Sequence, residues 1–169
     1  MDSAAQVHFR RARRRDVRKL GHSLGREHGA YFRARVPAQA RGEGRILVAI
    51  DAEGMPVGAV WVSWTRADEP EVNRCLPDVP LLYHFEVQKE MRGLKIGTRL
   101  LRYAEATLRA AGFHRVALGV DEWNIDARRL YERLGYRAGV PELQGLRTQS
   151  TGTGEHEFLD PFDILIHQL

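Results

Sequence analysis

The stretch "EMRGLKIGTRLL", Glu90 to Leu101, joins the end of a strand-like apolar run to the start of a helix-like apolar run. Within it lie two glycines, Gly93 and Gly97, and three cationic residues, Arg92, Lys95 and Arg99. Glycine allows unusual backbone dihedral angles, and the first amides of a helix have no partner inside the helix. Loose backbone and positive charge at a helix start are the chemistry of an anion site, so this stretch predicts one.

A purely structural role is the competing interpretation of these glycines. In it, Gly93 only shapes the turn and Gly97 only packs against the sheet. The position of the stretch, after a strand and before a strong helix, favours the anion site. The stretch is not a mononucleotide P-loop, because it lacks the Gly-Lys-Ser/Thr ending of that motif.

The preceding run "LLYHFEV", Leu81 to Val87, predicts a strand that carries two unexpected polar residues. Alternation divides the run into two faces, Leu81, Tyr83, Phe85 and Val87 against Leu82, His84 and Glu86. A strand covered on both faces should be apolar on both. His84 and Glu86 therefore indicate an edge strand with a solvated face, a satisfied structural pair, or a proton acceptor beside a bound cofactor.

The other elements predict an α+β, or mixed α/β, fold around one central sheet. The runs "RILVAID" and "VGAVWVSW" form a hairpin. An apolar stripe from Leu100 to Ala111 predicts a long helix that Gly112 ends, and a second helix is predicted between Asn124 and Gly135. Late strands are expected at residues 136–140 and in "FDILIHQL" at residues 162–169.

Three segments are expected to be connections. Residues 26–44 lack clear periodicity and have room for a short helix, and residues 66–80 carry three prolines. Residues 149–157, "QSTGTGEHE", form a loop of low complexity.

The densest positive charge lies in "FRRARRRDVRKL", Phe9 to Leu20, in a chain with 23 arginines and three lysines. A nucleic-acid-binding arm is one interpretation. The alternative is ordinary structure: Val7 and Phe9 alternate as in a strand, and apolar residues from Val17 to Leu24 have helical spacing after Asp16 as N-cap. We favour the solvated helix face, so a nucleic-acid partner is not expected.

Length and composition predict a single domain over residues 1–169. No apolar run is long enough to span a membrane or to serve as a signal peptide, so a cytoplasmic protein is expected. Cys75 is the only cysteine, which excludes a disulfide within the chain. The histidines lack ligand spacing, so no metal site is expected.

Two motifs resemble signatures of the GNAT superfamily of acyl-CoA-dependent N-acetyltransferases. The first is "VQKEMRGLKIG", which has Val87, Arg92 and Gly97 in place, whereas Lys95 stands where the family usually has its first glycine. The second is "NIDARRLYERLGY", which matches at Asn124, Ala127, Leu130, Tyr131, Glu132, Leu134, Gly135 and Tyr136.

The resemblance implies a GNAT-like mixed, mostly antiparallel sheet flanked by helices, with an opening between two adjacent parallel strands. It implies transfer of an acetyl group from acetyl-CoA to a primary amine by direct attack in a ternary complex. The pantetheine arm would pair with the end of "HFEV", and the diphosphate would lie on the amides after it. The cofactor-binding residues would be Phe85, Val87, Arg92, Gly93, Leu94, Lys95, Ile96, Gly97, Thr98, Asn124, Ala127 and Tyr131.

Catalytic roles follow in part from chemistry and in part from the resemblance. A protonated amine needs a base, for which His84 is the first choice and Glu86 the second, or the residue that orients His84. A backbone amide near Val87 would hold the carbonyl oxygen. The resemblance implies that Tyr131 protonates the departing thiolate, although from the residues alone Tyr131 fits the core and Asn124 an N-cap.

The expected partner is a small-molecule or peptide amine, with a homodimer as an open alternative. Two other functions stay open at this point. One is a module that senses acyl-CoA without turnover, and the other is an acyltransferase that acts on an RNA-linked amine.

Overall fold

One seven-stranded sheet runs through the residues that the computed structural model describes, which are 6–65, 67–146 and 161–169. Neighbouring strands follow the order β1-β2-β3-β4-β5-β7-β6 and are antiparallel, except that β4 and β5 are parallel. The strands are β1 (His8–Arg11), β2 (Gly44–Ile50), β3 (Pro56–Ser63), β4 (Leu81–Val87), β5 (Arg115–Asp121), β6 (Arg137–Ala138) and β7 (Phe162–Gln168). This confirms the predicted α+β class with a mixed, mostly antiparallel sheet.

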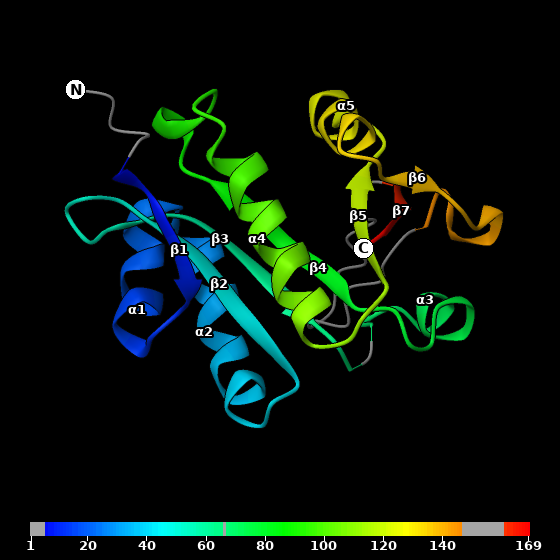
Figure 1. Cartoon of the computed structure of the whole chain (residues 1–169), viewed down its shortest axis with the longest axis horizontal. Helices are drawn as coiled ribbons and strands as arrows, with labels where there is room; N and C mark the ends of the chain where they lie inside the picture. Colours follow the sequence, from blue (N-terminus) through cyan, green and yellow to red (C-terminus); the bar gives the residue numbers. More distant parts are fainter. Residues whose placement is uncertain (1–5, 66, 147–160) are drawn as a thin grey trace, which may run out of the picture.

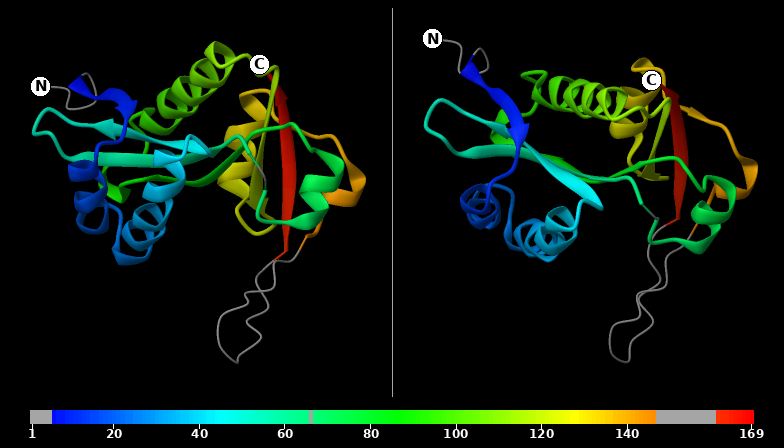
Figure 2. Two further views of the ribbon diagram at one scale, coloured as in Figure 1. Left: turned by 90° about the horizontal axis from the view of Figure 1, so that it is seen from below. Right: turned by 60° about the horizontal axis from the view of Figure 1, so that its bottom comes forward.

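Helices cover both faces of the sheet, with α4 on one face and α1 and α2 on the other (Figure 1, Figure 2). The helices are α1 (Arg14–Ser23), α2 (Arg26–Ala40), α3 (Pro70–Cys75), α4 (Ile96–Ala110) and α5 (Ile125–Arg133), with short 3-10 turns η2 (Lys89–Met91) and η3 (Pro141–Leu143). The α1 and α2 side packs on alternate sheet residues such as Val48 and Trp61, whereas α4 packs on Val60 and Val62. Alternating residues of β2 and β3 therefore belong to two separate hydrophobic cores.

Both helices predicted after the loop are present, as α4 and α5. Each is followed by a glycine in the left-handed region, Gly112 at φ +89° and Gly135 at φ +98°, which end the helices as expected. The apolar stripe of α4 faces the sheet and is fully buried at Leu100, Leu101, Ala104 and Leu108. The predicted hairpin is likewise present as β2 and β3.

Residues 26–44, expected to be a connection, instead contain the 15-residue helix α2. Only Gly29 and Phe32 of α2 are buried, and Pro37 lies inside the helix, so the sequence shows no clear apolar stripe. Packing on α1 stabilises α2 instead. A Cβ atom added at Gly29 would lie 2.4 Å from the Cα of Gly21, so the two helices cross at nearly bare backbone.

Two other expectations also need correction. Residues 66–80 contain the short helix α3, which has Pro70 at its first position, where a missing amide hydrogen costs nothing. The late strand expected at residues 136–140 is only the two-residue β6. The loop expected at residues 149–157 lies outside the described residues. Within the described ranges, no helix is both long and apolar enough to cross a membrane.

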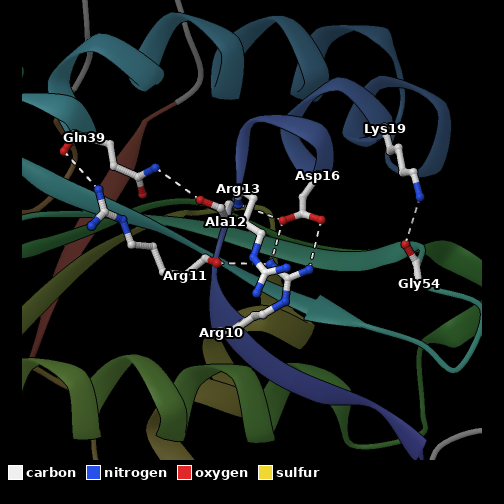
Figure 3. A network of polar contacts seen from close by, with 8 residues as sticks. All are labelled: Arg10, Arg11, Ala12, Arg13, Asp16, Lys19, Gln39 and Gly54. Atoms are coloured by element: carbon white, nitrogen blue, oxygen red, sulfur yellow. Dashed lines mark hydrogen bonds and ion pairs between the residues drawn. The ribbon is translucent and has the colours of Figure 1, made fainter.

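Asp16 does not cap α1 as predicted, because the helix begins at Arg14 and Asp16 is its third residue. Its carboxylate accepts a hydrogen bond from the backbone amide of Arg13 at 2.7 Å and two from the guanidinium of Arg10 at 2.6 and 3.0 Å (Figure 3). Burial raises the pKa of Asp16, but these hydrogen bonds lower it more, so the net shift is downward. Asp16 thus joins β1 to α1.

Replacing Asp16 with Asn should lower the free energy of unfolding at neutral pH by about 1–3 kcal/mol, because Arg10 loses a charged partner at a buried site. A lowered pKa in the folded state stabilises the protein above the carboxyl's ordinary pKa, and this contribution disappears as pH falls through the folded value. Urea denaturation at several pH values measures both effects. The control is Glu43→Gln, whose partner Arg41 is exposed, and it should change little. Equal effects of the two substitutions would contradict the assignment.

Candidate active site

The centre of the candidate site is β4, which lies between β3 and β5 in the interior of the sheet. This position excludes the edge-strand explanation of His84 and Glu86. However, β4 pairs with β5 only at Leu81 and Leu82, opposite Ala117 and Leu118. Beyond Leu82 the two parallel strands separate, so no strand of the described ranges pairs with this edge of the second half of β4, which agrees with the opening that the sequence resemblance implies.

A β-bulge at His84 makes the predicted alternation of β4 wrong beyond Tyr83. Ala59 of β3 pairs with Glu86, but Trp61 pairs with Tyr83, so β4 has one extra residue between these pairs. His84 itself adopts a positive φ of 49°. As a result Phe85 follows Leu82 onto the α4 side, where both join one core cluster, whereas Glu86 faces α2.

His84 lies against α2 in an aromatic contact. Its ring stacks on Tyr31 with centroids 3.5 Å apart, and its Nδ1 is 3.5 Å from Nδ1 of His28. Although His84 is exposed as a whole, desolvation of the ring stacked on Tyr31, with the charges of His28 and Arg35, lowers its pKa to about 4 despite the opposing charge of Glu86. At neutral pH His84 is therefore an uncharged imidazole with weak affinity for protons, which is unfavourable for the base role predicted for it.

Glu86 connects the end of β4 to two cationic or ionisable groups. Its Oε1 accepts a hydrogen bond from Nη2 of Arg92 at 2.7 Å and one from the amide of Val87 at 3.3 Å. Its Oε2 is 3.7 Å from Nε2 of His28. The amide of Val87, predicted to hold a carbonyl oxygen, is thus already bonded to a side chain. Nε of Arg92 also donates to the carbonyl of Val87 at 3.2 Å.

A pocket of about 240 Å³ opens at this point, between the turn that joins α1 to α2 and the end of β4. It is lined by Ser23, Leu24, His28, Glu86, Val87, Gln88, Lys89, Glu90 and Arg92. A larger hollow of about 420 Å³ lies elsewhere, beside His8, Arg10 and Lys19. Because β2 and β3 separate β1 from β4, that hollow is remote from the predicted chemistry.

The predicted anion loop leads directly into α4. In the described part of the chain, the amides of residues 93–98 donate no backbone hydrogen bond: the nearest such bonds run from Arg92 to Lys89 and from Arg99 to Lys95. These amides precede or begin a 15-residue helix, whose dipole adds partial positive charge at the same place. These amides, with the charges of Arg92 and Lys95, suit a phosphate-bearing ligand.

Lys95 stands in a backbone conformation that glycine adopts more easily. It is the N-cap of α4, with φ 60° and ψ 12°, which is the left-handed region. Gly93 also has a positive φ, 78°, with open space around it. Gly97 is different, since an added Cβ would meet Phe85 and Val87 at an ordinary 3.6 Å. Packing within the chain therefore does not require glycine at position 97.

The remaining predicted cofactor residues are distributed around this loop and α5. Leu94 is exposed at 37%. The side chain of Ile96 is buried in a core cluster, so only the backbone amide of Ile96 is available to a ligand. The side chain of Asn124 accepts a hydrogen bond from the amide of Ala127 at 3.2 Å and so caps α5. Thr98 is half-buried in the first turn of α4.

Tyr131 of α5 packs against β4 across the space between β4 and β5. Its ring centroid is 6.3 Å from that of Phe85, and only 7% of the residue is exposed. Burial, helped by the charges of Glu86 and Asp121, raises the pKa of Tyr131, so its hydroxyl keeps the proton at neutral pH. Tyr131 therefore combines a core position with the protonation state that an acid needs.

Sequence reasoning missed His28 and Tyr31. Both lie in α2, a helix without a visible apolar stripe, and no spacing in the sequence connects them to β4. Among the described residues, no cluster of three or more His, Cys, Asp or Glu could hold a metal ion.

The chain matches the acetyltransferase (GNAT) family over residues 11–136. A curated relative, the 5-NmdU N-acetyltransferase of Pseudomonas phage PaMx11, is 35% identical over 65 residues. That match covers 38% of this chain and 44% of the relative, so it spans less than half of the relative's length.

Solved structures resemble this one over nearly its full length. An acetyltransferase of the GNAT family from Streptococcus pneumoniae has a TM-score of 0.68 at 16% identity, and covers 97% of this chain and 100% of its own. One from Staphylococcus aureus Mu50 has a TM-score of 0.63 at 18% identity, with 96% and 99% covered. At these identities the likeness is one of fold.

The lowered pKa of His84 predicts a pH dependence of stability. The folded value is about 4, below the ordinary 6.5, so between these values the unfolded chain binds more protons than the folded chain. The free energy of unfolding should therefore fall as pH is lowered through this window, and His84→Gln should make that fall shallower. Urea denaturation at a series of pH values measures both slopes. Identical slopes would show that His84 titrates normally.

The left-handed Lys95 predicts that Lys95→Gly raises the free energy of unfolding by roughly 0.5–1 kcal/mol, because glycine adopts this conformation without a Cβ clash. Lys95→Ala is the matched control, since it removes the charge but keeps the strained Cβ. Urea denaturation distinguishes the two. A loss of stability in Lys95→Gly would mean that the backbone at this position is not strained.

Proposed function

Since the chain belongs to the acetyltransferase (GNAT) family, we propose that it transfers an acetyl group from acetyl-CoA to a primary amine by direct attack in a ternary complex. Family members use an acyl-CoA as co-substrate, which supplies an acyl group activated as a thioester. One observation carries the proposal. The unpaired edge of β4 leads into a loop with six consecutive amides that have no backbone acceptor among the described residues.

The residues of this region fit two parts of coenzyme A, its diphosphate and its pantetheine arm. Free amides and the dipole of α4 suit the diphosphate, together with Arg92 and Lys95. The open backbone edge of β4 suits the amides of the pantetheine arm, in the way that an added strand extends a sheet. We assign Phe85 and Val87 to this edge, and Asn124 and the helix that it caps to the opposite wall.

Two proton movements are required of the chain. The amine must lose a proton before it can attack, and the pocket beside Glu86 offers the nearby groups that can accept one. The departing sulfur must gain a proton. Tyr131 holds one at neutral pH and lies against Phe85, so we assign it this role.

The acceptor is proposed to be a small-molecule or peptide amine. The pocket of about 240 Å³ has room for an amine and the chain that bears it. The name of the phage relative, 5-NmdU N-acetyltransferase, supports N-acyl transfer as the reaction. An acceptor of that type therefore belongs in the panel of amines to be tested.

Calorimetry with coenzyme A tests the cofactor site without reference to any acceptor. The protein should bind coenzyme A, and Arg92→Ala should weaken binding about 10- to 100-fold, since a charged hydrogen bond contributes roughly 1.5–3 kcal/mol. The control is Arg109→Ala, in the last turn of α4, which should bind normally. Release of free thiol from acetyl-CoA across a panel of amines then identifies the acceptor. No uptake of coenzyme A by the folded protein would contradict the proposal.

A further inference from the structure

The fold brings two histidines and a carboxylate from distant parts of the chain into one row. His28 comes from α2, whereas His84 and Glu86 come from β4. Nε2 of His28 is 3.7 Å from Oε2 of Glu86, and Nδ1 of His28 is 3.5 Å from Nδ1 of His84. His28 therefore lies between the carboxylate and the second imidazole.

Only one of the two histidines faces the pocket at the end of β4. His28 and Glu86 both line it, together with the charged residues Lys89, Glu90 and Arg92, whereas His84 does not. An amine in this pocket reaches His28 first. His84 instead has one ring face covered by Tyr31. The guanidinium of Arg35 lies over the ring of Tyr31.

The neighbouring groups decide which member of the row can carry an added proton. Two imidazoles with nitrogens 3.5 Å apart do not both become cations, because like charges at this distance repel. His28 has a carboxylate beside its other nitrogen, which stabilises a positive ring, whereas Arg35 disfavours one at His84. Glu86 itself already accepts a hydrogen bond from Arg92 at 2.7 Å.

We propose that His28 accepts the proton that the acceptor amine must lose, and that Glu86 stabilises the charged His28 ring. The inference rests on the proposed function and names a residue for one of its steps. The ammonium group gives one proton to His28, which releases it to water through the open pocket. The nitrogen–carbon bond then forms as the carbon–sulfur bond breaks, and the second proton shed by nitrogen balances the one gained by sulfur.

Two small amines of similar shape distinguish a catalytic base at position 28 from a residue with only a structural role. Ethylamine is protonated at neutral pH and needs a base, whereas trifluoroethylamine is largely uncharged and does not. His28→Gln should lower kcat/KM for ethylamine by about 100-fold or more and change it little for trifluoroethylamine. Glu86→Gln should show the same selectivity to a smaller degree. The control is His22→Gln, an exposed histidine near the end of α1 that should leave both rates unchanged.

Calorimetric uptake of coenzyme A, measured on every variant, separates failure of this inference from failure of the proposed function. Unchanged uptake with a selective loss for ethylamine supports the role of His28. Unchanged uptake with equal losses for both amines, or with no loss, overturns it. Uptake by the wild-type protein without transfer to either amine also overturns it, while the cofactor site stands. No uptake by the wild-type protein would instead remove the proposed function itself.

Discussion

The separation of β4 from β5 is the constraint on which the rest of the site depends. The two strands are parallel neighbours in the middle of the sheet, yet they pair only at Leu81 and Leu82. Among the described strands, the second half of β4 pairs with β3 but not with β5, so its other backbone edge is open. Because β4 then runs directly into the loop before α4, one continuous stretch of backbone provides both the open edge and the free amides.

The bulge at His84 turns neighbouring side chains of the same strand toward opposite faces of the sheet. It inserts one residue, so Phe85 stays with the core beneath α4 and Glu86 turns toward α2. Side chains that face α2 and α4 thereby alternate from His84 to Glu86. Glu86 connects the two sides, since one of its oxygens binds Arg92 at the anion loop and the other faces His28 at the pocket.

Local patterns were sufficient to predict most of the fold. The stripe of α4 with Gly112 behind it, the hairpin, and the strand–loop–helix order around Lys95 are short-range features, and the structure contains each of them. The helix α2 was missed because two buried residues in fifteen, with Pro37 inside, leave no visible periodicity. The faces of β4 were assigned wrongly beyond Tyr83, because a bulge changes the alternation without marking the sequence.

Short-range sequence patterns are enough to predict an anion site before α4, because loop glycines, cationic side chains and a helix start are neighbours along the chain. They also place His84 and Glu86 on one strand, but not whether that strand is central or at an edge. The position of β4 inside the sheet, and what these residues face, follow from the folded chain. His28 and Tyr31 reach β4 because α2 packs on α1 through Gly21 and Gly29, and that contact is between backbones. Contacts of this kind leave no periodic signal, so the environment that weakens His84 as a base could be found only in the folded chain.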